Sequence, residues 1–236
     1  MAAITLYDLD VTGGRRPSPF CWRAKFALAH KRLAWDEVPV GFTEKDKIAF
    51  AGEGTRTVPI LVDQAQGGRV VKDSWDIAEY LDEAYVDGPA LLGGERGRAF
   101  ARFVAAWTNV TLHGALFPLV VADIHAAAHA QDKAYFRDSR EKRLGTTLEA
   151  AQAAAREQRI PALRATLEPL RQQLRDQPFI SGAAPAYPDY TVMGAFMWAR
   201  TICALPLLAE DDPLHAWIDR MLGLFDGMGR AHGTAA

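Results

Sequence analysis

The stretch GGRRPSPFCWRAKFALAHKRL, from Gly13 to Leu33, contains the helix start on which the fold assignment depends. Ser18 is a preferred N-cap residue, and Pro19 is favoured at the first position of a helix. Apolar residues then recur at helical spacing along the stretch. The sequence therefore predicts a helix from Pro19 to Lys31.

Short β-rich runs lie on both sides of this helix. The run AITLYDL precedes it and LAWDEVPV follows it, which predicts a β-α-β unit with a parallel strand pair. Two further strands, 59–63 and 69–72, are separated only by the turn QAQGG and should form a hairpin. The segments EKDKIAFAG and SWDIAEYLDEAY are expected to be helices, the first ending at Gly52.

Strand signals nearly vanish after residue 95. The preceding stretch VDGPALLGGE is punctuated by Gly and Pro and is typical of a linker. Beyond it, four leucines predict one helical stripe, and the segment 211–229 predicts a capped helix; the leucines are Leu163, Leu167, Leu170 and Leu174. We expect an α/β domain over residues 1–86, a linker over 87–95 and an all-helical domain over 96–236.

Composition excludes several classes of protein. The 236 residues include 27 Lys and Arg against 29 Asp and Glu, so a basic footprint for nucleic acid is missing. Two cysteines do not make a disulfide framework, which favours a reducing compartment. The N-terminus does not resemble a signal peptide, and the longest apolar run is too short to span a bilayer. We therefore expect a cytoplasmic protein without a membrane or nucleic-acid partner.

The helix start is also the first candidate for chemistry. Loops after the strands of α/β units bind ligands, and a helix N-terminus stabilises an anion such as a thiolate. Arg15, Arg16 and Arg23 should add positive charge there. Cys21 lies three residues after Ser18, and a serine at the first position excludes a local disulfide. The residues alone leave three alternatives: a reactive hydroxyl, a reactive thiol, or a plain helix cap over a packed cysteine.

Three spaced motifs resemble the cytosolic glutathione transferases. They are SPFCWRAKFALAHKRL, TVPILVD and VVKDSWDIAEYLDEAY, in that order. The resemblance implies a thioredoxin-like domain followed by an all-helical domain. Further details resemble the bacterial glutathione-dependent β-etherases of lignin breakdown and their fungal relatives; among them are ITLYDL, SREKRLG and PDYTVMGAFMWA.

The resemblance implies a glutathione site. Ser18 would donate a hydrogen bond to the glutathione sulfur and favour its thiolate. Val58 would pair through its backbone with the cysteinyl part, next to a cis Pro59. Asp73 and Ser74 would hold the γ-glutamyl end, although many relatives have the longer Glu at the position of Asp73. Three residues are candidates for the glycyl carboxylate: Lys45, Lys47 and Arg56.

The resemblance also places the second substrate between the domains. We expect a small aromatic electrophile or aryl ether there, and ether cleavage of lignin-derived compounds as one form of the reaction. The candidate pocket residues are Trp107, His113, Phe117, Tyr135 and Trp198. A homodimer is expected by analogy with the family. His125 and His129 have the spacing of a metal pair, but a third ligand in matching register is not evident, so we expect no metal site.

Two alternatives to a transferase stay open at this level. One is a glutathione-dependent thiol reductase that uses Cys21, and the other is a non-catalytic glutathione-binding or stress protein on the same fold. One departure from the family concerns folding. Its capping box has a hydroxyl residue three positions before an aspartate, and here Ala186 precedes Asp189. We expect packing of Tyr187 or Pro188 to compensate for the missing hydroxyl.

Overall fold

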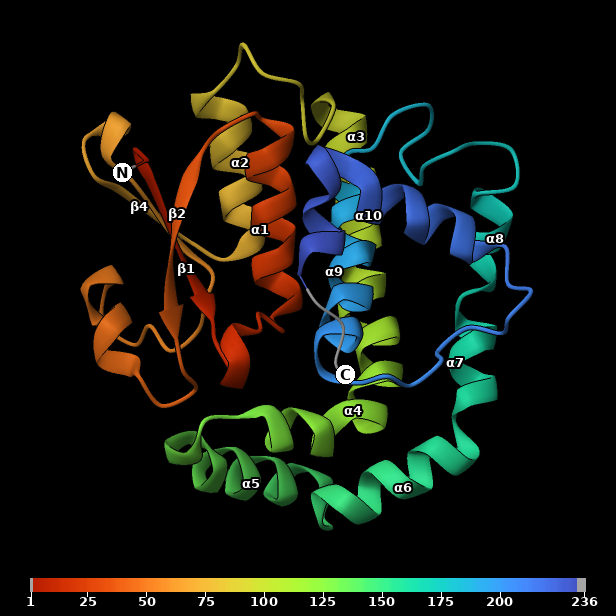
Figure 1. Ribbon diagram of the computed structural model, residues 1–236. Helices are drawn as coiled ribbons and strands as arrows, with labels where there is room; N and C mark the ends of the chain where they lie inside the picture. Colours follow the sequence, from red (N-terminus) through yellow and green to blue (C-terminus); the bar gives the residue numbers. More distant parts are fainter. Residues whose placement is uncertain (1, 233–236) are drawn as a thin grey trace.

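A four-stranded mixed sheet forms the N-terminal domain of the computed structural model, which describes residues 2–232 (Figure 1). The strand order is β2-β1-β3-β4, with bounds Trp35–Val40, Ile4–Leu9, Ile60–Asp63 and Arg69–Lys72. Strands β1 and β2 are parallel, and β3 is antiparallel to both β1 and β4. The predicted parallel pair and hairpin are both confirmed.

Helices cover both faces of the sheet. Helix α1 (Pro19–His30) and helix α2 (Ser74–Ala84) pack on one face through the main core, which contains Ile4 and Leu6 of β1. The 3-10 helix η2 (Lys45–Ala51) packs Ile48 against the opposite face. Successive side chains of a strand point to opposite faces of the sheet, so both faces of this sheet carry apolar residues that a helix can cover. The result is a thioredoxin-like arrangement.

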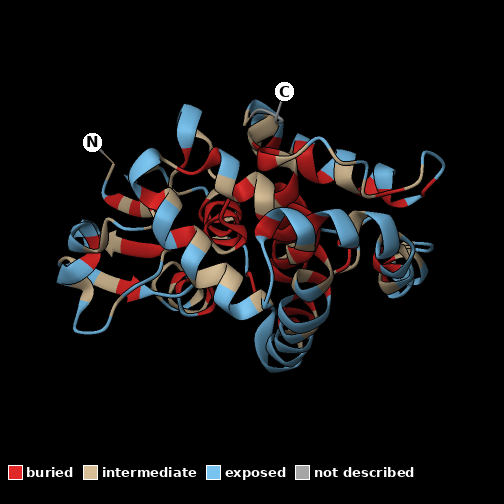
Figure 2. Ribbon diagram, turned by 90° about the horizontal axis from the view of Figure 1, so that it is seen from below, coloured by how far each residue is buried: buried red, intermediate tan, exposed pale blue. Residues whose placement is uncertain are grey.

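The C-terminal domain consists of helices. Their bounds are α3 Gly94–Trp107, η4 Thr108–Leu112, α4 His113–Ala127, α5 Ala130–Leu144, α6 Leu148–Gln158, α7 Ile160–Thr166, α8 Glu168–Gln173, α9 Tyr187–Ile202 and α10 Leu214–Ala231. Helix α9 is buried on nearly all sides and packs directly against α1, which joins the two domains. Figure 2 shows the buried residues concentrated in the interior and the exposed ones on the outer helices.

Helices α3, η4 and α4 follow one another without a break. By length and composition alone, the run Gly94–Ala127 is apolar enough to cross a membrane, and 44% of its most apolar window is buried inside the protein. The core helices of globular proteins have the same property, because an apolar stripe faces their neighbours. Here that stripe packs against α6 and α9.

Three predicted helices differ in detail from the structure. The leucine stripe is broken at Leu167, because Pro169 lies in the first turn of the next helix and cannot supply the N–H that would continue the old one. Helix α10 is interrupted by non-helical backbone at residues 224–227. The segment 44–52 is a 3-10 helix and not an α-helix, and it ends at Gly52 as expected.

The aspartate half of the capping box before α9 is formed, and a backbone carbonyl takes the place of the missing hydroxyl. The N–H of Asp189, which a capping hydroxyl would accept from, donates to the carbonyl of Ala186 at 3.0 Å. The carboxylate of Asp189 accepts hydrogen bonds from the backbone N–H groups of Ile180 (2.7 Å), Ser181 (3.1 Å) and Ala186 (3.2 Å). It also accepts one from the indole N–H of Trp217 at 3.1 Å. We expected packing of Tyr187 or Pro188 to compensate for the missing hydroxyl. Both residues are buried, but these hydrogen bonds also hold the start of α9.

Candidate functional site

The ends of all four strands meet at one edge of the sheet. The carboxyl ends of β1, β2 and β4 lie there together with the start of β3, because β3 runs antiparallel to the others. Ile60 pairs with Lys72, so Val58 and Pro59 before β3 lie beside Asp73 after β4. The N–H of Asp73 donates to the carbonyl of Pro59 at 3.3 Å. Topology thus joins motifs that are distant in sequence.

Ser18 lies at this edge, at the N-terminus of α1. Its Oγ accepts a hydrogen bond from the N–H of Cys21 at 3.2 Å, which confirms the predicted cap. The residue is 5% exposed and lines a cavity between the two domains. Because a hydroxyl that accepts from the backbone still carries its own proton, Ser18 can donate that proton to a ligand in the cavity.

Cys21 lies one turn further along α1 and faces the interior. Its side chain is fully buried, and it is not among the residues that line the cavity. Burial, reinforced by the carboxylate of Asp8, raises the pKa of the Cys21 thiol well above its usual value. A buried, protonated thiol is a poor nucleophile, so the geometry favours the packed cysteine over the reactive one.

The Val58–Pro59 peptide bond is cis, as the resemblance implies. Val58 lines the cavity, and its N–H and C=O have no hydrogen-bond partner within residues 2–232. These two free groups can pair with an extended peptide as an added strand does.

Asp73 caps helix α2 from a strained backbone. Its carboxylate accepts from the N–H of Trp75 at 2.8 Å, and its φ of 70° and ψ of 141° are unusual for a residue with a side chain. Ser74 begins α2 and is buried, and its carbonyl accepts a hydrogen bond from the hydroxyl of Tyr187 at 2.7 Å. Strained non-glycine residues of this kind cluster at functional sites, so Asp73 is a candidate ligand-binding residue as well as a cap.

The cavity at this edge has a volume of about 320 Å³ and lies between the sheet and helices α4, α5 and α9. It brings together most of the predicted residues: Ser18, Val58, Lys45, Arg56, His113, Phe117, Tyr135 and Trp198. The rings of Phe117 and Trp198 stack with centroids 6.3 Å apart, and His113 meets Trp198 edge to face. The site can therefore hold a flat apolar group above the Ser18 hydroxyl.

Two of the predicted residues lie elsewhere. Trp107 lines a separate hollow with residues of α3 and α8. It is six positions from His113, which is not a whole number of helical turns, so the two side chains lie on different faces of the run. The ammonium group of Lys47 is bound by Glu44 at 2.8 Å and by the carbonyl of Pro39 at 3.2 Å. Pro59, Asp73 and Ser74 lie beside Val58 but do not line the cavity itself.

The three arginines expected to make the helix start positive are used in other ways. Arg16 is paired with Asp10 and lies 3.4 Å from Glu37. Arg15 donates to the carbonyls of Thr12 (3.1 Å) and Thr201 (3.4 Å), which are outside the cavity. Arg23 is buried and donates to Asn109 at 2.8 Å. At the start of α1, the N–H groups of the helix therefore supply positive potential that these three side chains do not.

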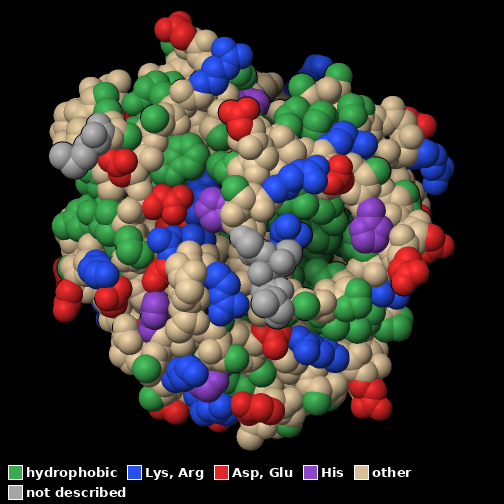
Figure 3. Space-filling model, viewed as in Figure 1, with side chains coloured by type: hydrophobic (Ala, Val, Ile, Leu, Met, Phe, Trp, Pro, Cys, Tyr) green, Lys and Arg blue, Asp and Glu red, His purple; other side chains and the backbone are tan. Residues whose placement is uncertain are grey.

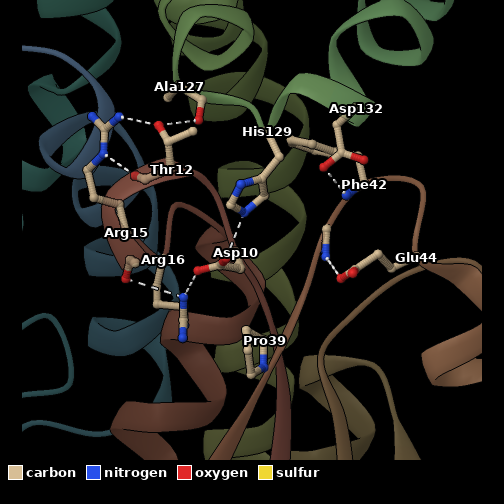
Figure 4. Close-up of polar contacts among 12 residues, drawn as sticks. Asp10, Thr12, Arg15, Arg16, Pro39, Phe42, Glu44, Ala127, His129 and Asp132 are labelled. Carbon is tan, nitrogen blue, oxygen red and sulfur yellow. Dashed lines mark hydrogen bonds and ion pairs between the residues drawn. The ribbon is translucent and has the colours of Figure 1, made fainter.

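Polar contacts hold the two domains together next to the site (Figure 4). Nε2 of His129 lies 2.7 Å from the Asp10 carboxylate, and Thr12 donates to the carbonyl of Ala127 at 2.8 Å. The carboxylate of Asp132 accepts from the N–H of Phe42 at 3.0 Å. These bonds fix the start of α5 against the loop after β2, and so set the width of the cavity.

The two histidines considered as a metal pair have separate roles. His129 binds Asp10, and the ring of His125 lies against Phe136 with centroids 6.3 Å apart. Within the part of the chain that the structure describes, three or more His, Cys, Asp or Glu side chains do not gather as a metal site.

His113 is a neutral group in the cavity wall. Burial, together with the nearby charge of Arg23, lowers its pKa to about 3. Nε2 of His113 lies 3.4 Å from the Arg23 guanidinium and the ring packs edge to face on Phe20. At neutral pH His113 therefore adds polarity to the wall without adding charge.

Sequence reasoning missed several residues of the cavity: Phe20, Phe42, Phe136, Arg140 and Arg143. Arg140 and Arg143 stand on α5 within the segment SREKRLG, where charges alternate and resemble a solvated helix face. The available signal was the spacing of Phe136, Arg140 and Arg143, since residues three or four positions apart share one side of a helix.

Comparisons with known proteins agree with this division of the chain. The family model of the glutathione S-transferase N-terminal domain matches residues 17–84, and that of the C-terminal domain matches residues 99–207. The chain belongs to the glutathione S-transferase family. This transferase chain is 28% identical over 218 residues to a glutathione transferase of Zea mays, covering 89% of the chain and 84% of that relative.

Solved structures of similar fold include both transferases and a glutaredoxin. A glutathione S-transferase of Ceriporiopsis subvermispora, solved with glutathione, has a TM-score of 0.76 at 23% identity, covering 95% of this transferase chain and 96% of that one. Glutaredoxin 2 of Salmonella typhimurium, also solved with glutathione, has a TM-score of 0.72 at 19% identity, with 96% of each chain covered. At these identities the likeness shows the fold alone.

Proposed function

We propose that this chain binds glutathione, favours its thiolate and directs the sulfur at an aromatic electrophile. The observation that carries the proposal is the position of the Ser18 hydroxyl. It stands at a helix N-terminus beside the free backbone groups of Val58 and opens on an aromatic cavity. A hydrogen bond to the thiolate and the partial charge of the helix both lower a thiol pKa.

The proposed glutathione site follows the strand ends. The cysteinyl backbone pairs with Val58, and the γ-glutamyl end reaches Asp73 and the N-terminus of α2 at Ser74. Lys45 and Arg56 are the proposed partners of the glycyl carboxylate, because both line the cavity, whereas Lys47 is occupied by Glu44. Cleavage of β-aryl ethers is a narrower proposal, in which the thiolate attacks the ether-bearing carbon next to a ketone and a phenolate leaves.

The direct test is glutathione-dependent turnover of an activated chloroarene, followed by a panel of aryl ethers. Conjugation that depends on Ser18 supports the transferase, whereas glutathione binding without any conjugation supports the non-catalytic alternative. Reduction of a disulfide substrate that depends on Cys21 would support a reductase. The burial of Cys21 argues against that result, since its thiol lies outside the cavity.

Replacing Asp73 with glycine separates its binding role from its capping role. Glycine adopts positive φ without strain and is a nearly adequate N-cap, so we expect stability to change by less than about 1 kcal/mol. Glutathione affinity should fall by about tenfold or more, because the carboxylate partner of the ammonium is lost. Calorimetric titration with glutathione and thermal unfolding measure the two effects. Unchanged affinity would show that Asp73 is only a cap.

We also propose that the chain forms a homodimer through the outer face of α3 and η4. Phe100, Phe103 and Val110 are large apolar side chains exposed on that run of helix. Neighbouring exposed apolar residues are typical of an interaction surface. Sedimentation velocity at micromolar concentration should give a dimer, and Phe103→Glu should shift it toward monomer. A wild-type monomer under these conditions would contradict the proposal.

A further inference from the structure

The cavity carries more positive charge than the proposed glutathione site uses. Four cationic side chains line it, and within the described residues no aspartate or glutamate does; the four are Lys45, Arg56, Arg140 and Arg143. Lys45 and Arg56 stand on the thioredoxin-like side, where the glycyl carboxylate of glutathione is proposed to bind. Arg140 and Arg143 stand on α5, on the helical side that faces the second substrate.

The two guanidinium groups on α5 lie against aromatic rings. The Arg143 guanidinium carbon lies 4.2 Å from the centre of the Phe117 ring, and that of Arg140 lies 4.6 Å from the Phe136 ring. Neither forms an ion pair within residues 2–232. Arg140 donates to the hydroxyl of Ser139 at 2.7 Å, and the side chain of Tyr135 also favours its charged form. Contact with a ring face holds each guanidinium group in place, and its N–H donors can bind an anion.

Nearby carboxylates do not neutralise these arginines. On the same helix, the oxygens of Asp132 accept from the N–H groups of Phe42 and Thr43, and Glu141 is paired with Arg137 at 2.7 Å. Burial lowers the pKa of Arg140, and the charge of Arg143 acts in the same direction, while Tyr135 opposes both. The lowered pKa means that burial disfavours the charged form of Arg140. A bound anion would favour that form, because it supplies an opposite charge in a partly desolvated place.

We infer that the second substrate is an aromatic electrophile that bears an anionic group, such as a carboxylate. Its ring packs on Phe117 and Trp198, and its anion binds Arg140 and Arg143. This inference rests on the proposed transferase function. With a chloroarene the glutathione thiolate forms a C–S bond at the ring carbon, the C–Cl bond breaks, chloride leaves, and the thiol proton goes to solvent.

A matched pair of substrates tests the inference. We would compare 4-chloro-3,5-dinitrobenzoate with its methyl ester, which has the same ring and leaving group without the charge. Each kcat/KM is divided by the uncatalysed rate with glutathione, because the ester activates the ring more strongly. We expect a preference of at least about tenfold for the acid, and a smaller one at high salt, as a charge contact requires.

Variants of α5 locate the source of that preference. Arg140→Met and Arg143→Met should each reduce it several-fold, and Arg140→Lys should retain part of it. The matched control is Lys142→Met, which removes one positive charge from the same helix at an exposed position outside the cavity. It should leave the preference unchanged. A similar loss in the control would show a general charge effect and overturn the inference.

The possible failures are distinguishable. If the enzyme converts the ester at the same normalised rate as the acid, the inference that the second substrate is anionic is overturned. The transferase proposal then stays intact. In the Arg140→Met variant, the KM for glutathione is measured with each of the two electrophiles. If it rises equally with both, Arg140 binds glutathione and not the second substrate. Binding of the two finished glutathione conjugates is measured by calorimetry as well. If the acid conjugate does not bind more tightly than its ester, the inference is wrong even where turnover is undetectable.

Discussion

Replacing Ser18 with alanine is expected to slow conjugation by about 10- to 150-fold at neutral pH. This range corresponds to the loss of one hydrogen bond to a charged group, about 1.5–3 kcal/mol. The Ser18 hydroxyl accepts from the backbone at the start of α1 and so keeps its own proton for a ligand, and Ser18 lines the cavity where the sulfur is proposed to lie. The measurement is kcat/KM for a chloroarene and glutathione over a range of pH.

The pH profile distinguishes a lost hydrogen bond from a damaged site. Wild-type Ser18 favours the thiolate and so lowers the pKa of bound glutathione, and alanine should move that pKa upward. The loss in rate should therefore shrink as the pH rises, because the thiol then ionises without help. A loss that is equal at every pH would indicate misplacement of glutathione and not altered ionisation.

A second substitution separates catalysis from helix capping. Ser18 also accepts a hydrogen bond from the N–H of Cys21, so alanine should cost about 1 kcal/mol of folding stability. Ser18→Asp keeps a capping acceptor but has no proton to donate to a thiolate and repels it. We expect near wild-type stability and a loss of activity at least as large as that of alanine.

Cys21→Ala is the matched control within the same helix turn. The thiol is fully buried and burial raises its pKa, so its removal should affect packing and leave kcat/KM within a few-fold. The reverse result, in which Cys21→Ala abolishes activity while Ser18→Ala retains it, would make the thiol the reacting group. The transferase proposal would then be replaced by the reductase.

Local signals in the sequence predict the sheet side of the cavity, where glutathione is proposed to bind. The cap Ser18-Pro19, the hairpin after Pro59 and the cap at Asp73 are each encoded within a few residues. Strand pairing then brings them to one edge, because a crossover helix and a hairpin leave few topologies. The cis bond before Pro59 and the place of Val58 in the cavity wall agree with this reading.

The helical side of the cavity depends on contacts that the sequence does not encode locally. Trp107 and His113 are both aromatic residues near the linker, yet they lie on different faces of one helical run and line different hollows. Arg140 and Arg143 face the cavity because Asp132 and His129 fix the start of α5 on the other domain. Periodicity shows which residues share a helix face, but it does not show what that face will meet.

Replacing Asp189 with alanine is expected to lower the free energy of unfolding by about 3 kcal/mol or more. The substitution would leave three backbone N–H groups and the Trp217 indole N–H without an acceptor in a buried place. Each unsatisfied buried donor costs about 1–3 kcal/mol, reduced where water can enter. Denaturant unfolding measures the change, with an unchanged m value indicating that the unfolded state is the same.

Two variants calibrate that loss. Asp189→Asn keeps one acceptor oxygen but turns an NH₂ group toward two of the donors, so it should destabilise by an intermediate amount. Glu95→Ala removes an exposed acid from the first turn of α3 and should change stability by less than about 0.5 kcal/mol. If Asp189→Ala were as mild as Glu95→Ala, the hydrogen bonds of the carboxylate would not be what holds the segment before α9 in place. A large effect should also reach the proposed glutathione site, because Tyr187 at the start of α9 bonds to the carbonyl of Ser74.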